Sequence, residues 1–187
     1  MSVKINYNNS SSKKNSSNLI LFSDENYNIL GLKNYISSSE YSFIVDLIKT
    51  KDLKKKILSF DLSSKRKIIL ISLKKNIKNS DVENLGAKFY DLFKDFKQSE
   101  YTLNSNTISK QLNRFVGHFL HGVKLKSYRF EKYKSKKNKK NIVINVVGKN
   151  QTTNTDKFKF KAIEQGTFFT RDLVSEPGNI LHPDEYA

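Results

Sequence analysis

The stretch that most constrains the fold is Lys67-Ile-Ile-Leu-Ile-Ser-Leu73, which is apolar at nearly every successive position. A strand with one face in water alternates apolar and polar residues, whereas a strand covered on both faces forms a continuous apolar run. This stretch is therefore predicted to be a central strand of a sheet that carries helices on both sides. A chain of 187 residues can hold one good-sized core of this kind, with little left over for a second domain.

Strands and amphipathic helices are predicted to interleave along the whole chain. Ser37 with Glu40, and Ser80 with Glu83, each form the pattern of a capping box ahead of apolar residues at helical spacing. Further helices are predicted over residues 112–123 and 156–175, and further strands over residues 3–7, 19–22, 57–60, 101–103 and 142–147. This order of elements predicts an α/β fold, a largely parallel or mixed sheet flanked by helices.

The composition limits the cellular compartment and the kinds of chemistry expected of this protein. The absence of cysteine excludes disulfides, thiol-based zinc sites and a cysteine nucleophile. Met1 leads into a polar tract, which is not typical of a signal peptide. Apolar runs such as residues 68–71 are far too short to cross a bilayer. We therefore expect a cytoplasmic protein with no membrane contact.

The formal net charge of +16 suggests a polyanionic partner such as DNA, but the type of cation weakens that interpretation. The arginines are Arg66, Arg114, Arg129 and Arg171, and lysine supplies the rest of the positive charge. Readout of base edges favours the bidentate arginine fork. A lysine-rich, asparagine-rich composition is also what codon bias in an AT-rich genome produces. If the charge is instead a selected surface, the candidate nucleic-acid contacts are Lys134, Lys136, Lys137, Lys139 and Lys140.

Residues 128–133 interleave aromatic and charged side chains next to this lysine-rich loop, a pattern that also occurs on surfaces that bind single strands. The same alternation is typical of an extended segment that packs its aromatic rings inward, and we favour packing. The glycines are isolated along the sequence, so no glycine-rich phosphate loop is predicted.

Two pairs of residues could be mistaken for a catalytic or metal site. His118 and His121 are three positions apart on a predicted helix, a spacing that can place two imidazoles on one metal. No nearby carboxylate completes a ligand set, so boundary or surface histidines are predicted. Asp184 and Glu185 directly follow Pro183, where acidic side chains offset the dipole of a helix first turn. We therefore assign no catalytic and no metal-binding residue to this chain.

The final stretch of the sequence resembles the segment that opens the catalytic domain of leucyl aminopeptidases. That segment runs roughly Ala-Arg-Asp-Leu-Val-Asn-x-Pro-x-Asn-x-Leu-Thr-Pro-x-x-x-Ala. The matching residues are Arg171, Asp172, Leu173, Val174, Pro177, Asn179, Leu181, Pro183 and Ala187. Ser175 stands where the family usually has Asn, and His182 where it usually has Thr.

A second segment is similar to the Gly-x-x-Leu-x-x-Tyr-x-Phe-x-x-Tyr pattern of the N-terminal domain of the same family. Gly122, Leu125, Tyr128, Phe130 and Tyr133 fit this pattern. The family's metal-binding Asn-Thr-Asp-Ala-Glu-Gly-Arg motif is only mimicked at residues 154–156, which lack the following Glu, Gly and Arg. No metal role is therefore carried over to that position.

The resemblance implies a macro-domain-like N-terminal domain over residues 1–152, followed over residues 153–187 by the connecting helix and the start of a missing catalytic domain. The chain therefore looks truncated. Family members are hexameric exopeptidases that release N-terminal amino acids from peptides, and they use two divalent metals, Zn or Mn, bound in the catalytic domain. By itself this chain is expected to be inactive, to bind no metal, and to be monomeric or weakly associated.

An alternative of a different class is a non-catalytic binding module that has kept only the macro-like domain and contacts DNA through its lysine-rich loops. The basic runs at residues 49–56 and 132–140 would then form the contact surface. Binding of that kind depends steeply on salt and weakens when the lysines of residues 136–140 are neutralised. A third reading is the product of a decayed aminopeptidase gene.

Overall fold

A computed structural model describes residues 3–8, 18–96, 99–108, 114–135, 141–178 and 180. Its strands form one six-stranded sheet in the order β1-β6-β5-β2-β4-β3. All neighbouring strands are parallel except β3 and β4, which are antiparallel. The strands are β1 (Val3–Tyr7), β2 (Asn18–Asp24), β3 (Ile57–Ser63), β4 (Arg66–Leu73), β5 (Glu100–Asn104) and β6 (Ile142–Val147). The sheet is mixed, as the sequence predicts.

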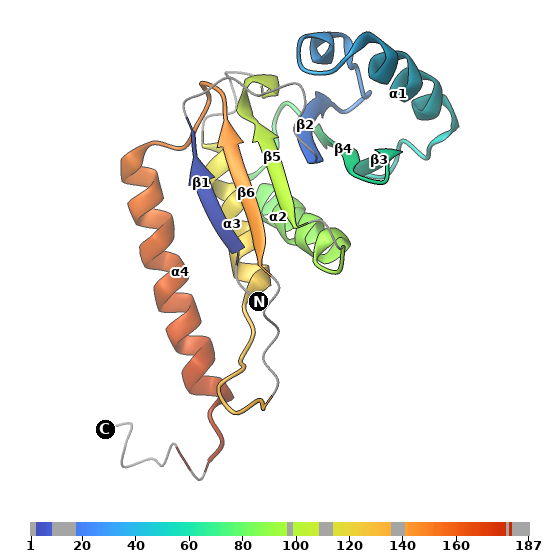
Figure 1. Ribbon diagram of the computed structural model, residues 1–187. Helices are drawn as coiled ribbons and strands as arrows, with labels where there is room; N and C mark the ends of the chain where they lie inside the picture. Colours follow the sequence, from blue (N-terminus) through green and yellow to red (C-terminus); the bar gives the residue numbers. More distant parts are fainter. Residues whose placement is uncertain are drawn as a thin grey trace.

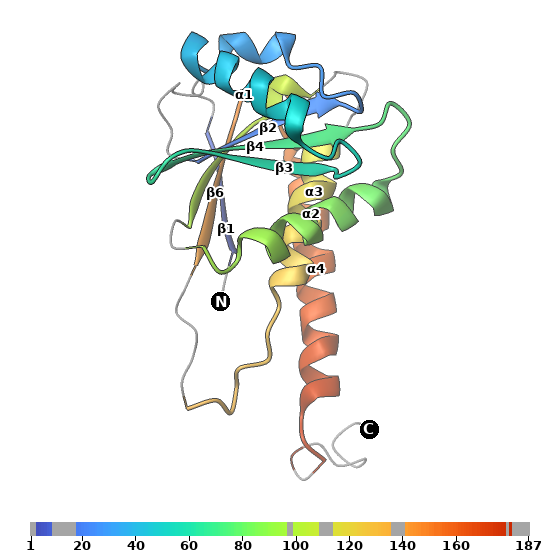
Figure 2. The same ribbon diagram turned by 90° about the vertical axis from the view of Figure 1, so that its right-hand side faces the viewer.

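Helices lie on both sides of this sheet. The helical elements are η1 (Leu30–Asn34), α1 (Ser38–Thr50), α2 (Asn79–Phe93), η2 (Ser105–Thr107), α3 (Phe115–Ser127) and α4 (Asn154–Ser175). Figure 1 shows α2 and α3 behind β1, β6 and β5, with the long helix α4 standing beside them. Figure 2 shows α1 on one side of β2, β4 and β3, and α2 with α3 on the other. The predicted α/β class, with helices flanking a mixed sheet and a further long helix at the end, is confirmed.

The continuous apolar run does form a strand covered on both faces. In β4, Ile69 and Ile71 pack into the core beneath α2 and α3, whereas Ile68 and Leu70 pack into the core beneath η1 and α1. All four side chains have an exposed fraction of 0%. The period of two along the strand thus divides the same run between two hydrophobic cores.

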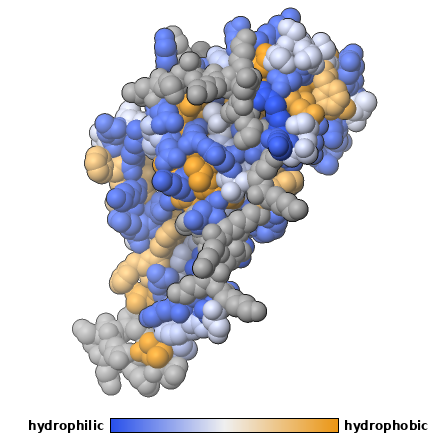
Figure 3. Space-filling view, in the orientation of Figure 1, coloured by the Kyte–Doolittle hydropathy of each residue, from blue (hydrophilic) through white to orange (hydrophobic). Residues whose placement is uncertain are grey.

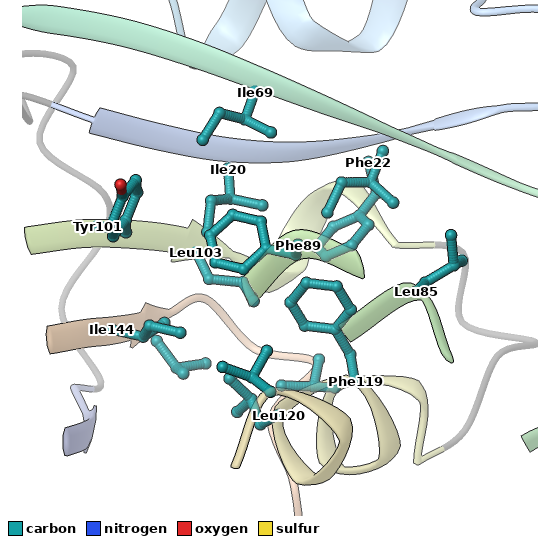
Figure 4. Close-up of a cluster of buried hydrophobic side chains, with 14 of the residues drawn as sticks. Ile20, Phe22, Ile69, Leu85, Phe89, Tyr101, Leu103, Phe119, Leu120 and Ile144 are labelled. Atoms are coloured by element: carbon teal, nitrogen blue, oxygen red, sulfur yellow. The ribbon is translucent and has the colours of Figure 1, made fainter. Parts of the chain in front are cut away.

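The larger core is organised around phenylalanine rings. Phe119 of α3 lies 5.7 Å from Phe89 of α2 and 5.9 Å from Phe22 of β2, measured between ring centroids. Figure 4 shows these rings between the strands and helices, with Ile20 and Leu103 on the sheet side. The Phe22–Phe119 pair is edge-to-face, an arrangement that adds about 0.5–1.5 kcal/mol to the effect of burial.

Helices α2 and α3 cross with their backbones in contact, and glycine makes this possible. A Cβ added at Gly86 of α2 would lie 2.0 Å from the carbonyl oxygen of Phe119. A Cβ added at Gly122 of α3 would lie 2.0 Å from the carbonyl oxygen of Glu83. Each glycine therefore faces the backbone of the opposite helix, where no side chain fits.

The helix starts test the capping predictions. The box at α1 is confirmed: the Glu40 amide donates to the Ser37 hydroxyl, and the Ser37 amide donates to the Glu40 carboxylate. The box at α2 is wrong, because Lys78 is the N-cap, makes no side-chain cap hydrogen bond, and leaves Ser80 inside the helix. Glu83 instead binds α3, as described below.

The two later helices also start at different positions from those predicted. Helix α4 begins at Asn154, two residues before the predicted start, because the Thr153 hydroxyl caps the amide of Asp156 at 3.1 Å. Helix α3 begins at Phe115, and the predicted start at Leu112 lies outside the described residues.

The helix crossing yields a matched pair of stability predictions. Gly86→Ala should lower the free energy of unfolding by about 1–3 kcal/mol, because the new methyl group forces the two backbones apart. Gly166→Ala in α4 is the control, since a Cβ there meets nothing within 4 Å. The control should raise stability by up to about 1 kcal/mol through helix propensity. Urea unfolding of the three proteins measures both effects, and equal stabilities for Gly86→Ala and wild type would contradict the close crossing.

Candidate functional site

The two histidines that the sequence singled out share one carboxylate. The Nδ1 atoms of His118 and His121 each lie 3.0 Å from Oε1 of Glu83, which projects from the neighbouring helix α2. The expectation that no carboxylate lies near the pair is therefore wrong. Boundary or surface histidines are predicted: His118 is half-buried, as at a boundary, whereas His121 is buried, with an exposed fraction of 6%. Sequence spacing could not reveal this contact, because it joins residues 35 and 38 positions apart.

The shared acceptor determines which ring nitrogen of each histidine donates. An ionised carboxylate only accepts hydrogen bonds, so both Nδ1 atoms carry a proton and donate to Glu83. Burial raises the pKa of Glu83, but the hydrogen bonds from His118 and His121 outweigh it and hold that pKa below the usual 4.5. The Nε2 atom of His121 is buried and has no hydrogen-bond partner among the described residues.

Helix α4 closes over this cluster. The ring of Phe160 lies 4.9 Å from the His118 ring and 5.1 Å from the His121 ring, measured between centroids. The same ring fills the space above Gly117, where a Cβ would approach it to 2.4 Å. The cluster is thus a junction of three helices, with Glu83 from α2, the histidines from α3 and Phe160 from α4.

The contacts within the junction are hydrogen bonds between its own side chains. Both Nδ1 atoms donate to the carboxylate, so the remaining lone pair of each imidazole lies on Nε2. In the described part of the chain, no group of three or more His, Cys, Asp or Glu residues could hold a metal ion. The chemistry that the cluster supports is therefore charge-assisted hydrogen bonding between helices.

The far end of α4 is held by the end of α3 and by the segment that follows it. The Tyr128 hydroxyl donates to Asp172 at 2.8 Å, Lys132 pairs with Glu176 at 2.6 Å, and Arg171 donates to the carbonyl oxygen of Leu125 at 2.6 Å. These contacts involve residues from both family-like segments, so the two resemblances describe one structural unit. The aromatic segment is not a strand here.

Packing of this aromatic segment is confirmed only in part. The Tyr128 ring lies 5.2 Å from the ring of Phe168 in α4, whereas Tyr133 has an exposed fraction of 52%. The Tyr133 hydroxyl also contacts the Glu176 carboxylate. The first tyrosine of the segment therefore packs against α4, while the last keeps half of its surface in water.

The candidate nucleic-acid contacts are only partly described. Lys134 is exposed, and Lys136, Lys137, Lys139 and Lys140 lie outside the described residues. The acidic pair Asp184 and Glu185 also lies outside them. In the earlier basic run, Lys49 pairs with Asp46 at 3.0 Å, and residues 51 and 54–56 are exposed. A nucleic-acid surface in these loops stays a prediction.

Apolar side chains remain uncovered along α4. Phe158, Phe169 and Val174 have exposed fractions of 74%, 65% and 78%. Figure 3 shows apolar atoms among polar ones in the lower left of the molecule, where α4 lies. Across the described residues, no helix is both long enough and apolar enough to span a membrane.

Comparison with known proteins gives this architecture a family context. A probable cytosol aminopeptidase of Rickettsia canadensis is 30% identical over 124 residues, which cover 63% of this chain and 25% of that protein. The structure of a tomato leucine aminopeptidase mutant superposes with a TM-score of 0.72 at 16% sequence identity, and the match covers 97% of this chain and 40% of the tomato chain. The bottromycin maturation enzyme BotP in complex with Mn superposes with a TM-score of 0.62 at 11% sequence identity, and the match covers 91% of this chain and 34% of the BotP chain. No protein-family model matches the chain.

The α/β sheet with its long final helix has the fold of the N-terminal domain of leucine aminopeptidases. In sequence and in fold, the chain matches the N-terminal domain portion of the cytosol aminopeptidases, and the resemblance to this family is confirmed. The matched part of this chain spans between 16% and 25% of the length of the curated cytosol aminopeptidases to which it is similar.

The three-helix junction generates a pH-dependent prediction. Because the pKa of Glu83 is lowered in the folded state, its stabilising effect is complete above about pH 4.5 and is lost as the pH falls through the folded-state pKa. Glu83→Gln should destabilise the protein by about 1–2 kcal/mol near pH 7, and this difference from wild type should shrink toward pH 3. Glu25→Gln, which removes an exposed carboxylate from the turn after β2, is the control and should leave stability nearly unchanged. A Glu83→Gln effect that is constant from pH 7 to pH 3 would contradict the assignment.

Proposed function

We propose that this chain is the N-terminal portion of a leucyl aminopeptidase, a metal-dependent exopeptidase that releases N-terminal amino acids from peptides in the cytoplasm. The observation that carries the proposal is the match of 97% of the chain to the fold of a leucine aminopeptidase. The sequence identity to cytosol aminopeptidases over 63% of the chain supports it.

Under this proposal the chain has a structural role, and the chemistry belongs elsewhere in the full-length protein. Two divalent metals, Zn or Mn, would supply the Lewis acid when bound in the catalytic domain. The described residues offer no group that fits such ions, so no step of the reaction is assigned to them. Residues 1–152 would form the N-terminal domain, and residues 153–187 would contain the connecting helix and the start of the catalytic domain.

The surface of α4 agrees with this division. A helix of a free-standing domain buries its apolar stripe, yet Phe158, Phe169 and Val174 are largely exposed. In a full-length aminopeptidase, these side chains would lie where the connecting helix meets the rest of the protein. Assembly into a hexamer would be a property of that full-length protein, because the family makes most of its subunit contacts through catalytic domains.

The proposal predicts that the isolated chain is inactive as a peptidase. The purified 187-residue protein should release no p-nitroaniline from leucine p-nitroanilide, with or without added Mn²⁺ or Zn²⁺, because no described residues form a metal site. Tomato leucine aminopeptidase under the same conditions is the positive control. Turnover above the blank that copurifies with the chain through two successive columns would contradict the proposal.

A further inference from the structure

A cavity of about 330 Å³ lies at the carboxyl ends of the parallel strands, away from α4 and from the three-helix junction. Phe22, Ser23 and Asp24 at the end of β2 form one wall. Leu73 at the end of β4 and residues 106–107 of η2 form another, and η1 closes the side toward α1. Volumes of roughly 300–1,000 Å³ are typical of small-molecule sites.

The cavity stands at the point where the connections of the sheet change direction. The connection that leaves β2 runs through η1 and α1 toward β3 and β4, whereas the connection that leaves the adjacent strand β5 runs through η2 and α3 toward β6. The connections that follow these two neighbouring parallel strands thus run to opposite sides of the sheet. In open α/β sheets, the crevice outside the carboxyl ends of such a pair is where ligands bind.

Hydrogen bonds join the segments that form the wall of the cavity. The Phe22 amide donates to the Thr107 hydroxyl at 3.0 Å, which joins β2 to η2. Oδ1 of Asp24 accepts from the Asn28 amide at 2.8 Å and fixes the turn after β2. Within that turn, Tyr27 is buried and adopts the left-handed conformation with φ of 54°. Its hydroxyl donates to the carbonyl oxygen of Lys55, so the rim is anchored on both sides.

The groups that face the cavity are mainly hydrogen-bond donors. Lys74 and Lys75 are exposed and form no ion pair within the described residues. Asn28 and Asn106 each use Oδ1 to accept a backbone amide, at 3.1 Å and 2.7 Å, and each leaves its Nδ2 without a partner among the described residues. Ser23 has an exposed fraction of only 7%, and its hydroxyl also lacks a partner there.

These donors are set against an apolar floor. Phe22, Leu32 and Leu73 line the cavity and are buried, and the half-buried Tyr35 borders it. The one acidic lining group, Asp24, has an oxygen engaged by backbone amides. The cavity therefore combines two exposed lysines and several neutral donors with a hydrophobic surface, which complements an anionic head on an apolar body.

We propose that this cavity is a binding site for a small organic anion, a carboxylate or phosphate ester whose apolar part rests on Leu32 and Tyr35. Lys74 and Lys75 neutralise the anionic group, and the Ser23 hydroxyl donates to it. Binding here requires neither a metal nor peptide hydrolysis, so the proposal stands apart from the peptidase assignment.

Amide NMR on the full ¹⁵N-labelled chain tests the site. Phenyl phosphate and phenylacetate are the anionic probes, and neutral phenylacetamide has the same ring. At least one anionic probe should shift the amides of Ser23, Asn28 and Asn106 saturably, while phenylacetamide should bind at least about tenfold more weakly. The anionic probe that binds more tightly identifies the phosphate or the carboxylate as the natural head group. Equal binding of all three probes, or no saturable shift from either anion, would overturn the proposal.

Paired lysine variants separate this site from the general positive charge. Lys74→Gln with Lys75→Gln should raise the Kd of the bound anion by about tenfold or more. Lys159→Gln with Lys161→Gln removes the same charge from exposed positions on α4 and should change the Kd by less than about twofold. Ser23→Ala should raise the Kd by about threefold while leaving thermal stability unchanged or raised, because the lost hydroxyl has no partner among the described residues. Equal losses in the two lysine pairs would show diffuse attraction and overturn the site.

Discussion

The backbone contact between α2 and α3 is the constraint on which the rest of the structure depends. Gly86 and Gly122 remove the side chains that would separate the helices. Close approach then brings Glu83 to the two histidines of α3 and presses Phe119 against the aromatic core. The outer surface of α3, at Gly117, receives Phe160 of α4. A methyl group at the crossing would disturb both the core and the docking of the final helix.

The two ends of the strand order carry different elements. The end with β1 and β6 lies beside the long helix α4, whose far end is anchored by the contacts described above. The end with β2 and β4 has η1 and α1 packed over a smaller core on one face, and the donor-lined cavity lies at the carboxyl ends of these strands. The family match covers the whole arrangement, but the two regions fit different roles: attachment for α4 and binding of a small ligand for the cavity.

Local patterns predicted the elements well, and nonlocal contacts set the limits of that prediction. The run at residues 67–73 predicts a strand because burial on both faces leaves no room for polar residues. The box at Ser37 formed as predicted, and Arg66 binds the same Glu40 carboxylate without displacing the cap. The box at Ser80 failed because α2 begins earlier, with Lys78 as its N-cap, and Glu83 binds the two imidazoles of α3. The cavity could not be predicted, since its walls come from separate segments that share no motif.

The intact mass of the native gene product, captured from its own cell with an antibody raised against this chain, tests the central assignment most directly. A mass well above 21.7 kDa, with peptides that continue into a metal-binding peptidase sequence, is the result expected for the N-terminal portion of a leucyl aminopeptidase. A native product of 21.7 kDa would contradict that assignment, because the protein would then lack the part to which the peptidase chemistry is attributed.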